Sequence, residues 1–279
     1  MAGRAGAAAR RPARRPGAPR GRVPAPDRHR RRRGRVVRAL AAQTAAELRL
    51  TLRRGESVLL TLAIPVGLLA FFSVVHVLPL PAGVHRPVQF LAPGILALAV
   101  MSTAMVSLGI ATGFERQYLV LKRLGATPLG RPTLLAAKTL AILAVEVVQV
   151  VVLVGVALAL GWSPGGDPAA AFGAVILATA AFAGLGLAMA GALRAEVTLA
   201  AANGLYLILL LIGGMVFPLS HLPGALADVA RALPSAALSG ALHATLTGGG
   251  PGGGAESWIV LAAWAVAAPV VAALTFRWE

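Results

Sequence analysis

The chain has 279 residues, of which 57% are hydrophobic and only 13% are charged. Because soluble domains carry about 25% charged residues, this composition excludes an ordinary soluble protein and indicates an integral membrane protein. The sequence has no cysteine, which excludes disulfide bonds and thiolate metal sites, and its five scattered histidines lack ligand spacing, so we expect no metal site.

The net charge of +16 comes mostly from the first 38 residues, which hold fourteen arginines and one acid, Asp27. This segment is rich in Ala, Gly, Pro and Arg and poor in bulky apolar residues, so we predict a disordered cytoplasmic tail over residues 1–37. Anionic lipid headgroups would attract it, with each nearby arginine contributing about 1 kcal/mol. Translation from a downstream start near Val36 is the alternative. Nucleic-acid binding is disfavoured, since no aromatic residues alternate with the arginines.

Residues 38–56 alternate apolar and charged positions at helical spacing. One face can hold the apolar and small residues Leu40, Ala41, Thr44, Leu48 and Leu52, with Arg49, Arg53 and Glu56 opposite. This pattern predicts an interfacial amphipathic helix on the cytoplasmic leaflet.

Six later segments are long and apolar enough to cross the roughly 30 Å hydrocarbon core of a bilayer. They comprise residues 57–77, 90–114, 139–160, 169–193, 197–219 and 257–276. Because backbone groups in lipid must satisfy their own hydrogen bonds, these segments are predicted to be helices. Residues 38–279 are therefore expected to form one all-α transmembrane domain.

Lysines and arginines are unevenly distributed over the connections between these segments. With the N-terminus inside, the cytoplasmic side holds ten of them even without the tail, whereas the outer side holds Arg86 and Arg231 alone. The positive-inside rule therefore predicts a six-helix protein of the cell membrane with both termini in the cytoplasm. The outer connection 219–246 is too apolar for a solvated loop, and we predict two short external helices there, separated at Pro234.

One cytoplasmic connection, between the second and third spans, has an unusual sequence: residues 114–138 read FERQYLVLKRLGATPLGRPTLLAAK. Phe114, Tyr118, Leu121 and Gly125 recur at i, i+4, i+7 and i+11, and Thr127-Pro128 suits the start of a new helix. We therefore predict a short amphipathic helix parallel to the membrane, a break, and then the third span. A simple topology anchor is the alternative, although positive charges alone would serve that purpose.

The run Glu115-Arg116-x-x-x-x-Leu121-Lys122-Arg123-Leu124-x-x-Thr127-Pro128-Leu129 resembles the signature of type-2 ATP-binding-cassette (ABC) transporter permeases. In that family the run forms the coupling helix that docks into the ATPase subunit. The resemblance covers the chain from about residue 38 to its end. It implies a coupling role for Phe114, Glu115, Arg116, Tyr118, Leu121, Lys122, Arg123, Leu124, Thr127 and Pro128.

No G-x-x-x-x-G-K-[ST] motif occurs, so the chain has no P-loop with which to cradle phosphate. We therefore expect no enzymatic activity and no cofactor on this chain, with ATP and Mg²⁺ bound by a separate ABC ATPase subunit. Six helices make half of a typical export pathway, so we expect a homodimer or a pair with a sister permease. The resemblance implies exported drugs, lipids, polysaccharides or haem-related molecules, and the sequence does not choose among them.

Polar residues inside the spans are candidates for the translocation pathway. Glu146 and Gln149 share a face of the third span, and an ionisable group in hydrocarbon costs about 2.5–3.5 kcal/mol on insertion scales. Asn203 and Tyr206 form a weaker polar face in the fifth span. Hydrogen bonding between helices is the alternative role for these residues.

Small residues form a ridge in the fourth span that allows another helix to approach closely: Ala180, Gly184 and Ala188. Two functions of other classes also stay open at this point. One is a membrane-embedded scaffold or assembly factor that recruits a cytoplasmic partner, and the other is an ion-coupled carrier centred on Glu146.

Overall fold

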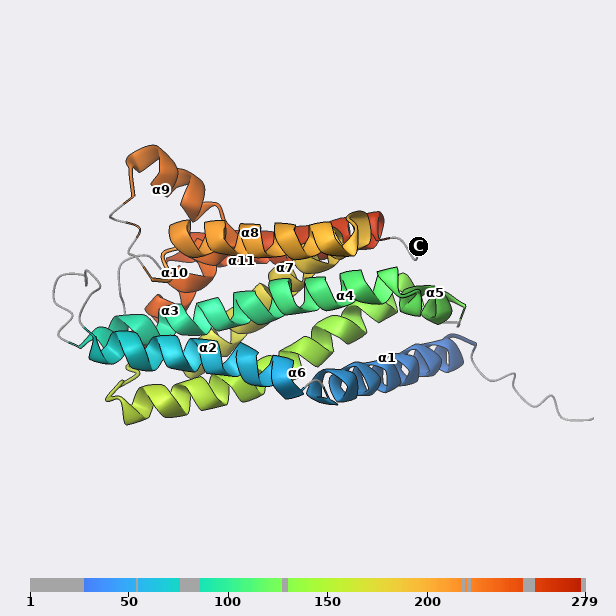
Figure 1. Cartoon of the computed structure of the whole chain (residues 1–279), viewed down its shortest axis with the longest axis horizontal. Helices are drawn as coiled ribbons and strands as arrows, with labels where there is room; N and C mark the ends of the chain where they lie inside the picture. The colour runs from blue at the N-terminus through green and yellow to red at the C-terminus, as the bar shows by residue number, and fades with distance from the viewer. Residues whose placement is uncertain are drawn as a thin grey trace, which may run out of the picture.

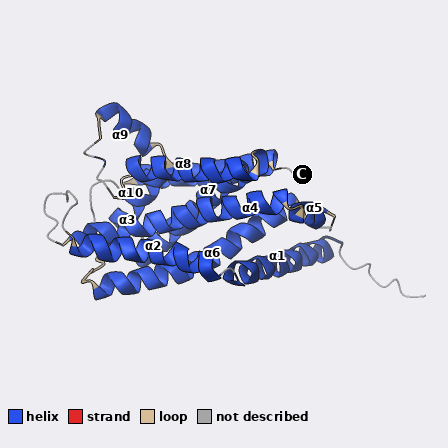
Figure 2. Ribbon diagram, in the orientation of Figure 1, coloured by secondary structure: helices blue, strands red, loops and turns tan. Residues whose placement is uncertain are grey.

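The structure is a computed structural model that describes residues 28–53, 55–75, 86–126, 130–216, 219, 222–247 and 254–276. Within these ranges every long element is a helix (Figure 2). In chain order the elements are α1 (Arg28–Arg53), α2 (Gly55–Val74), α3 (Pro87–Met101), the π-helix η1 (Ser102–Ser107), α4 (Leu108–Gln117), α5 (Val120–Gly125), α6 (Arg131–Ala159), α7 (Pro168–Ala192), α8 (Ala195–Ile212), α9 (Gly224–Arg231), α10 (Pro234–Thr247) and α11 (Ala255–Thr275).

Five helical segments of the described chain are long and apolar enough to cross a membrane. They are Pro87–Gln117, in which α3, η1 and α4 are continuous, together with Arg131–Ala159, Pro168–Ala192, Ala195–Ile212 and Ala255–Thr275. These segments coincide with the second to sixth predicted spans. The first predicted span falls on α2, whose described apolar part, Thr61–Val74, is shorter. The predicted all-helical membrane protein is therefore confirmed, while a sixth crossing stays a prediction.

The long helices extend along the long axis of the molecule (Figure 1). α5, the first turns of α1 and the end of α11 lie at one end, which we call the α5 end, and α9 lies toward the other. α11 packs along α7, α1 packs along α6, and α4 packs against both α7 and α8. The positive-inside rule predicts that the α5 end faces the cytoplasm, and this orientation stays a prediction.

α1 begins earlier than predicted, at Arg28 instead of near residue 38. The predicted tail over residues 1–37 thus overlaps the first turns of α1 at residues 28–37. Arginine, a good helix former, fills six of the ten positions 28–37, and the sequence has no proline between Pro26 and Pro65, so the helix can extend toward the N-terminus. The rest of the predicted tail, residues 1–27, lies outside the described residues.

The inward face of α1 also differs from the predicted stripe. Ala41 and Leu52 are exposed, whereas Glu47 is buried. Glu47 can occupy this face because it pairs with a cation on α6. A hydrophobic pattern alone cannot predict such a pairing, since it treats every acidic side chain as solvent-facing.

Close packing of α7 and α11 depends on Gly184. A Cβ atom at this position would lie 2.5 Å from the backbone of Ala268 and Pro269 in α11. The neighbouring members of the predicted ridge, Ala180 and Ala188, are half-buried. The absence of a side chain at Gly184 therefore lets the two backbones approach, as helices in membranes often do.

Replacing Gly184 by alanine is expected to destabilise the protein by about 1–3 kcal/mol, because the added methyl group would force the two backbones apart. Thermal unfolding of the purified protein in detergent measures the effect. Gly155→Ala on α6 is the matched control, since a Cβ there would have no atom within 4 Å. Equal melting temperatures for the two variants would contradict this packing.

α10 belongs to the helix bundle, because it packs against α3, α7 and α11. Its His243 has Nε2 3.0 Å from the carbonyl oxygen of Phe90 in α3 and Nδ1 2.7 Å from that of Ser239. Burial lowers the pKa of His243 below its ordinary value. The segment between α8 and α11 thus contributes to the core through α10.

Candidate functional site at the α5 end

The predicted coupling segment forms the end of one helix and the whole of a second. α4 ends at Gln117, Leu119 adopts a left-handed conformation with φ 59° and ψ 18°, and α5 starts at Val120. Such a conformation costs a residue other than glycine on the order of 1–3 kcal/mol. The single amphipathic helix predicted from the spacing is therefore wrong, because the turn at Leu119 separates Phe114 from Leu121.

The turn presents three consecutive apolar side chains outward. Tyr118 is 69% exposed, Leu119 is 52% exposed and Val120 is 40% exposed, and we call these three residues the apolar tip. The ring of Phe114 stacks on that of Tyr118, with centroids 6.2 Å apart. Exposed apolar groups of this kind, next to charged residues, are typical of binding surfaces.

The remaining residues of the predicted segment divide between the surface and the interior. Lys122 and Arg123 are exposed on α5, whereas Leu124 is half-buried. Leu121 is fully buried within the chain, so it is not accessible as a contact for a partner protein. Thr127 and Pro128 lie outside the described residues.

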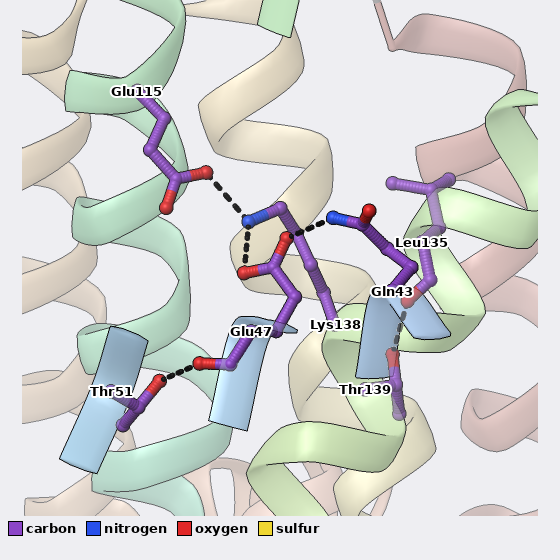
Figure 3. Close-up of polar contacts among 7 residues, drawn as sticks. All are labelled: Gln43, Glu47, Thr51, Glu115, Leu135, Lys138 and Thr139. Atoms are coloured by element: carbon purple, nitrogen blue, oxygen red, sulfur yellow. Dashed lines mark hydrogen bonds and ion pairs between the residues drawn. The ribbon is translucent and has the colours of Figure 1, made fainter. Parts of the chain in front are cut away.

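Glu115, at the end of α4, points into the protein and meets a buried lysine (Figure 3). Lys138 of α6 is 1% exposed, and its Nζ lies 2.6 Å from Oε2 of Glu115 and 2.9 Å from Oε2 of Glu47 on α1. Gln43, one turn earlier on α1, donates from Nε2 to Oε1 of Glu47 at 2.9 Å. We call Glu47, Glu115 and Lys138 the lysine cluster.

The lysine cluster joins α1, α4 and α6 at one point. Removing charged groups from water costs several kcal/mol per ion, and close ion pairs with further hydrogen bonds recover this cost. Here one ammonium group serves two carboxylates, and Gln43 supplies a further hydrogen bond to one of them. Loss of the ammonium would leave the buried carboxylate of Glu47 and the partly buried carboxylate of Glu115 without their counterion, so the cluster fixes how the three helices meet.

Arg116 and Gln117 fasten the end of α4 to two other helices. The guanidinium group of Arg116 donates to the carbonyl oxygens of Gly191 and Leu193, the latter at 2.7 Å. These carbonyls lie at the C-terminal end of α7, where intrahelical donors run out. Gln117 donates to Oε1 of Glu196 at the start of α8 at 2.6 Å. Residues 115–117 therefore connect α4 to α6, α7 and α8 in turn.

Sequence reasoning missed the inward role of Lys138 and of Glu47. By the positive-inside rule Lys138 is only one of the cytoplasmic positive charges, and nothing in the local pattern distinguishes Glu47. The signal in the sequence is the rarity of acids, because Glu47 and Glu115 are two of only nine acidic residues after position 38. An acid in a basic, apolar segment is a candidate partner for a buried cation.

The four candidate pathway residues do not form one polar surface. Glu146 is buried and accepts a hydrogen bond from Thr179 of α7, while Gln149 is bonded to Thr103 and to the backbone of Thr61. On α8, Asn203 is exposed and donates to the carbonyl oxygen of Leu199, one turn earlier. Tyr206, also on α8, is half-buried. The α6 pair is thus enclosed within the chain, and Asn203 lies on its outside.

Comparison with known proteins places these features in a family context. The family described as ABC-2 type transporter matches residues 38–246. No curated protein matches the sequence. The matched range contains both the lysine cluster and the apolar tip.

Proposed function

The chain belongs to the ABC-2 type transporter family, and from this membership we propose that it forms, as a dimer, the export pathway of a transporter driven by a separate ATPase subunit. The family assignment makes the chain a membrane permease subunit and not itself an enzyme. ATP and Mg²⁺ would bind to the ATPase, because this sequence has no P-loop.

The observation that carries the coupling proposal is the apolar tip. Tyr118 and Leu119 are both more than half exposed at the α5 end, next to the exposed cation Arg123. Aromatic anchors that insert into a pocket, with charged residues around them, dominate the affinity of many protein interfaces. We propose that the ATPase subunit covers this tip.

The inner side of the same segment would transmit the movement. Glu115 is held by Lys138, and Arg116 is held by the end of α7. A displacement of the tip would therefore act on α6 and α7 at once. In this proposal Tyr118, Leu119, Val120, Lys122 and Arg123 contact the ATPase, while Glu115, Arg116 and Leu121 connect the contact to the membrane helices.

The composition of the exposed face of α8 favours the proposal that a second permease copy binds there. This face is apolar, with Leu199, Leu207 and Leu211 exposed, but it also carries the amide of Asn203. Polar side chains in membrane helices tend to face protein or a water-filled cavity instead of lipid. We propose that a second permease, or the pathway between two copies, lies against Asn203. The enclosed position of Glu146 gives no support to an ion-coupled carrier.

The coupling proposal predicts that Tyr118→Ala lowers recovery of the ATPase subunit with the tagged permease about tenfold, because interface anchors contribute about 1.4 kcal/mol or more. The measurement is copurification from native membranes in mild detergent, followed by assay of ATP hydrolysis. Phe172→Ala, an exposed aromatic at the start of α7, is the matched control. Undiminished recovery with Tyr118→Ala would refute docking at the tip, and the absence of any copurifying ATPase would refute the ATP-driven exporter.

A further inference from the structure

Two irregular backbone segments, one in α2 and one in the continuous helix Pro87–Gln117, are hydrogen-bonded to the same side chain of α6. Pro65 lies inside α2, and a proline has no N–H with which to bond the carbonyl group four residues earlier. That carbonyl belongs to Thr61. The second segment is η1, a π-helical turn inside the continuous helix Pro87–Gln117. Both segments are places where a helix can bend. π-turns are rare overall, and those that occur are often found at functional sites.

Gln149 of α6 connects the two segments. Its Nε2 donates to the carbonyl oxygen of Thr61 at 2.8 Å, and its Oε1 accepts from Oγ1 of Thr103 in η1 at 3.0 Å. The side chain is only 4% exposed, so these bonds are shielded from water. Gln149 thus supplies to the Thr61 carbonyl group an N–H donor that Pro65 cannot provide within α2. Its side-chain oxygen accepts the hydrogen bond from Thr103 in the π-turn.

η1 is held on its other side by α7. A Cβ atom at Gly186 would lie 2.5 Å from the carbonyl oxygen of Met105, so this glycine gives the widened turn its room. The π-turn therefore lies between Gln149 and Gly186 and has little freedom to shift sideways.

The position of Gln149 along α6 relates it to the lysine cluster. Gln149 follows Lys138 by eleven residues, which places the two side chains about 17 Å apart along the axis and within about 20° of the same face. Lys138 binds α1 and α4. Gln149 binds α2, which follows α1 in the chain, and η1, which immediately precedes α4. α6 therefore clamps both segments at two levels.

We propose that Gln149 is a positioning residue that makes the turn of α2 around Pro65 and the π-turn of η1 act as one hinge. When the α5 end is displaced, the parts of α2 and α4 on that side swing together about Gln149, while the rest of α6 keeps its place. The proposal rests on the proposed transmission from an ATPase to the membrane helices, but it can be tested on the permease alone. The Gln149 amide is suited to this role because it donates and accepts at once.

The absence of native cysteine makes the test direct, since spin labels can be attached to introduced cysteine pairs without background. Distances are measured by double electron–electron resonance in lipid nanodiscs. One pair, Tyr118→Cys with Leu158→Cys, reports α4 against the far part of α6. A second pair, Leu59→Cys with Leu158→Cys, reports α2. A control pair, Phe172→Cys with Leu274→Cys, reports α7 against α11. All five positions are exposed.

In Gln149→Leu, the distance distributions of the α4 pair and the α2 pair are each expected to show a second population of distances, about tenfold more populated than in the native protein. The distance distribution of the α7–α11 pair is expected to stay unchanged. Thr103→Val, which removes one hydroxyl group, is expected to shift the α4 pair alone. Pro65→Ala restores an N–H for the Thr61 carbonyl group, so adding it to Gln149→Leu is expected to return the α2 pair to its original distribution.

Unchanged distance distributions for the α4 and α2 pairs in Gln149→Leu would overturn the hinge. Broadening of all three distance distributions would also overturn it, because Gln149 would then be a general stabilising residue. If Gln149→Leu does not fold, Thr103→Val decides: a shift confined to the α4 pair supports the hinge, and any other result overturns it. Because no ATPase is present, these outcomes are independent of the Tyr118→Ala experiment.

Discussion

Replacing Lys138 by methionine is expected to destabilise the protein by about 3–5 kcal/mol, because it leaves one buried and one partly buried carboxylate without their cation. Glu47 and Glu115 lie 2.9 and 2.6 Å from the Lys138 ammonium nitrogen, and methionine fills similar space without a charge. Thermal unfolding in detergent, followed by tryptophan fluorescence, measures the loss. Arg131→Met is the matched control, since Arg131 is an exposed cation on the first turn of the same helix.

A compensating variant tests the cause of this loss. Adding Glu47→Gln and Glu115→Gln to Lys138→Met removes the uncompensated charges, and neutral replacement of a whole buried ion cluster is often close to neutral in stability. We therefore expect the triple variant to recover most of the melting temperature. A triple variant as unstable as Lys138→Met would show that packing, and not charge, explains the effect of Lys138.

Replacing Arg116 by alanine is expected to cost about 3 kcal/mol, because two hydrogen bonds from a charged donor are lost at the end of α7. The carbonyl groups of Gly191 and Leu193 would lose the donor that Arg116 supplies. Hydrogen exchange followed by mass spectrometry should show faster exchange at the α7–α8 junction, residues 189–198, than in the native protein.

The lysine variant at this position provides a graded comparison. Lysine keeps the charge, but its single ammonium group lacks the planar fork with which arginine reaches two acceptors. Arg116→Lys is therefore expected to lie between the native protein and Arg116→Ala, both in stability and in the rate of hydrogen exchange at residues 189–198. Exchange at residues 189–198 that is the same in all three proteins would contradict a role for Arg116 at the end of α7.

The sequence was sufficient for the features that depend on local composition. Apolar segments of about twenty residues must become helices in lipid, so the second to sixth spans could be placed to within a few residues. The break between α4 and α5 could not be placed, because Leu119 is not a residue that favours a left-handed conformation. Its conformation depends on neighbours that hold it there.

The division of the coupling segment between inward and outward side chains was equally inaccessible to sequence reasoning. The spacing of Phe114, Tyr118 and Leu121 predicted a shared outward face, but Leu121 is buried and Tyr118 is exposed. The pairing of Glu115 with Lys138 joins α4 to α6, and the bond from Gln149 to Thr61 joins residues 88 positions apart. Such pairs depend on tertiary structure, which periodicity within one segment does not report.

The burial of Lys138 also bears on how the protein is made. Before α1 packs against α6, Lys138 lacks the carboxylate of Glu47, and in the orientation that the positive-inside rule predicts, its ammonium group would help to keep this end of α6 on the cytoplasmic side. Once the helices assemble, the same group leaves water and binds Glu47 and Glu115. We therefore expect Lys138 to serve first as an orientation signal and then as a structural counterion, with membrane insertion of α6 preceding its pairing with α1.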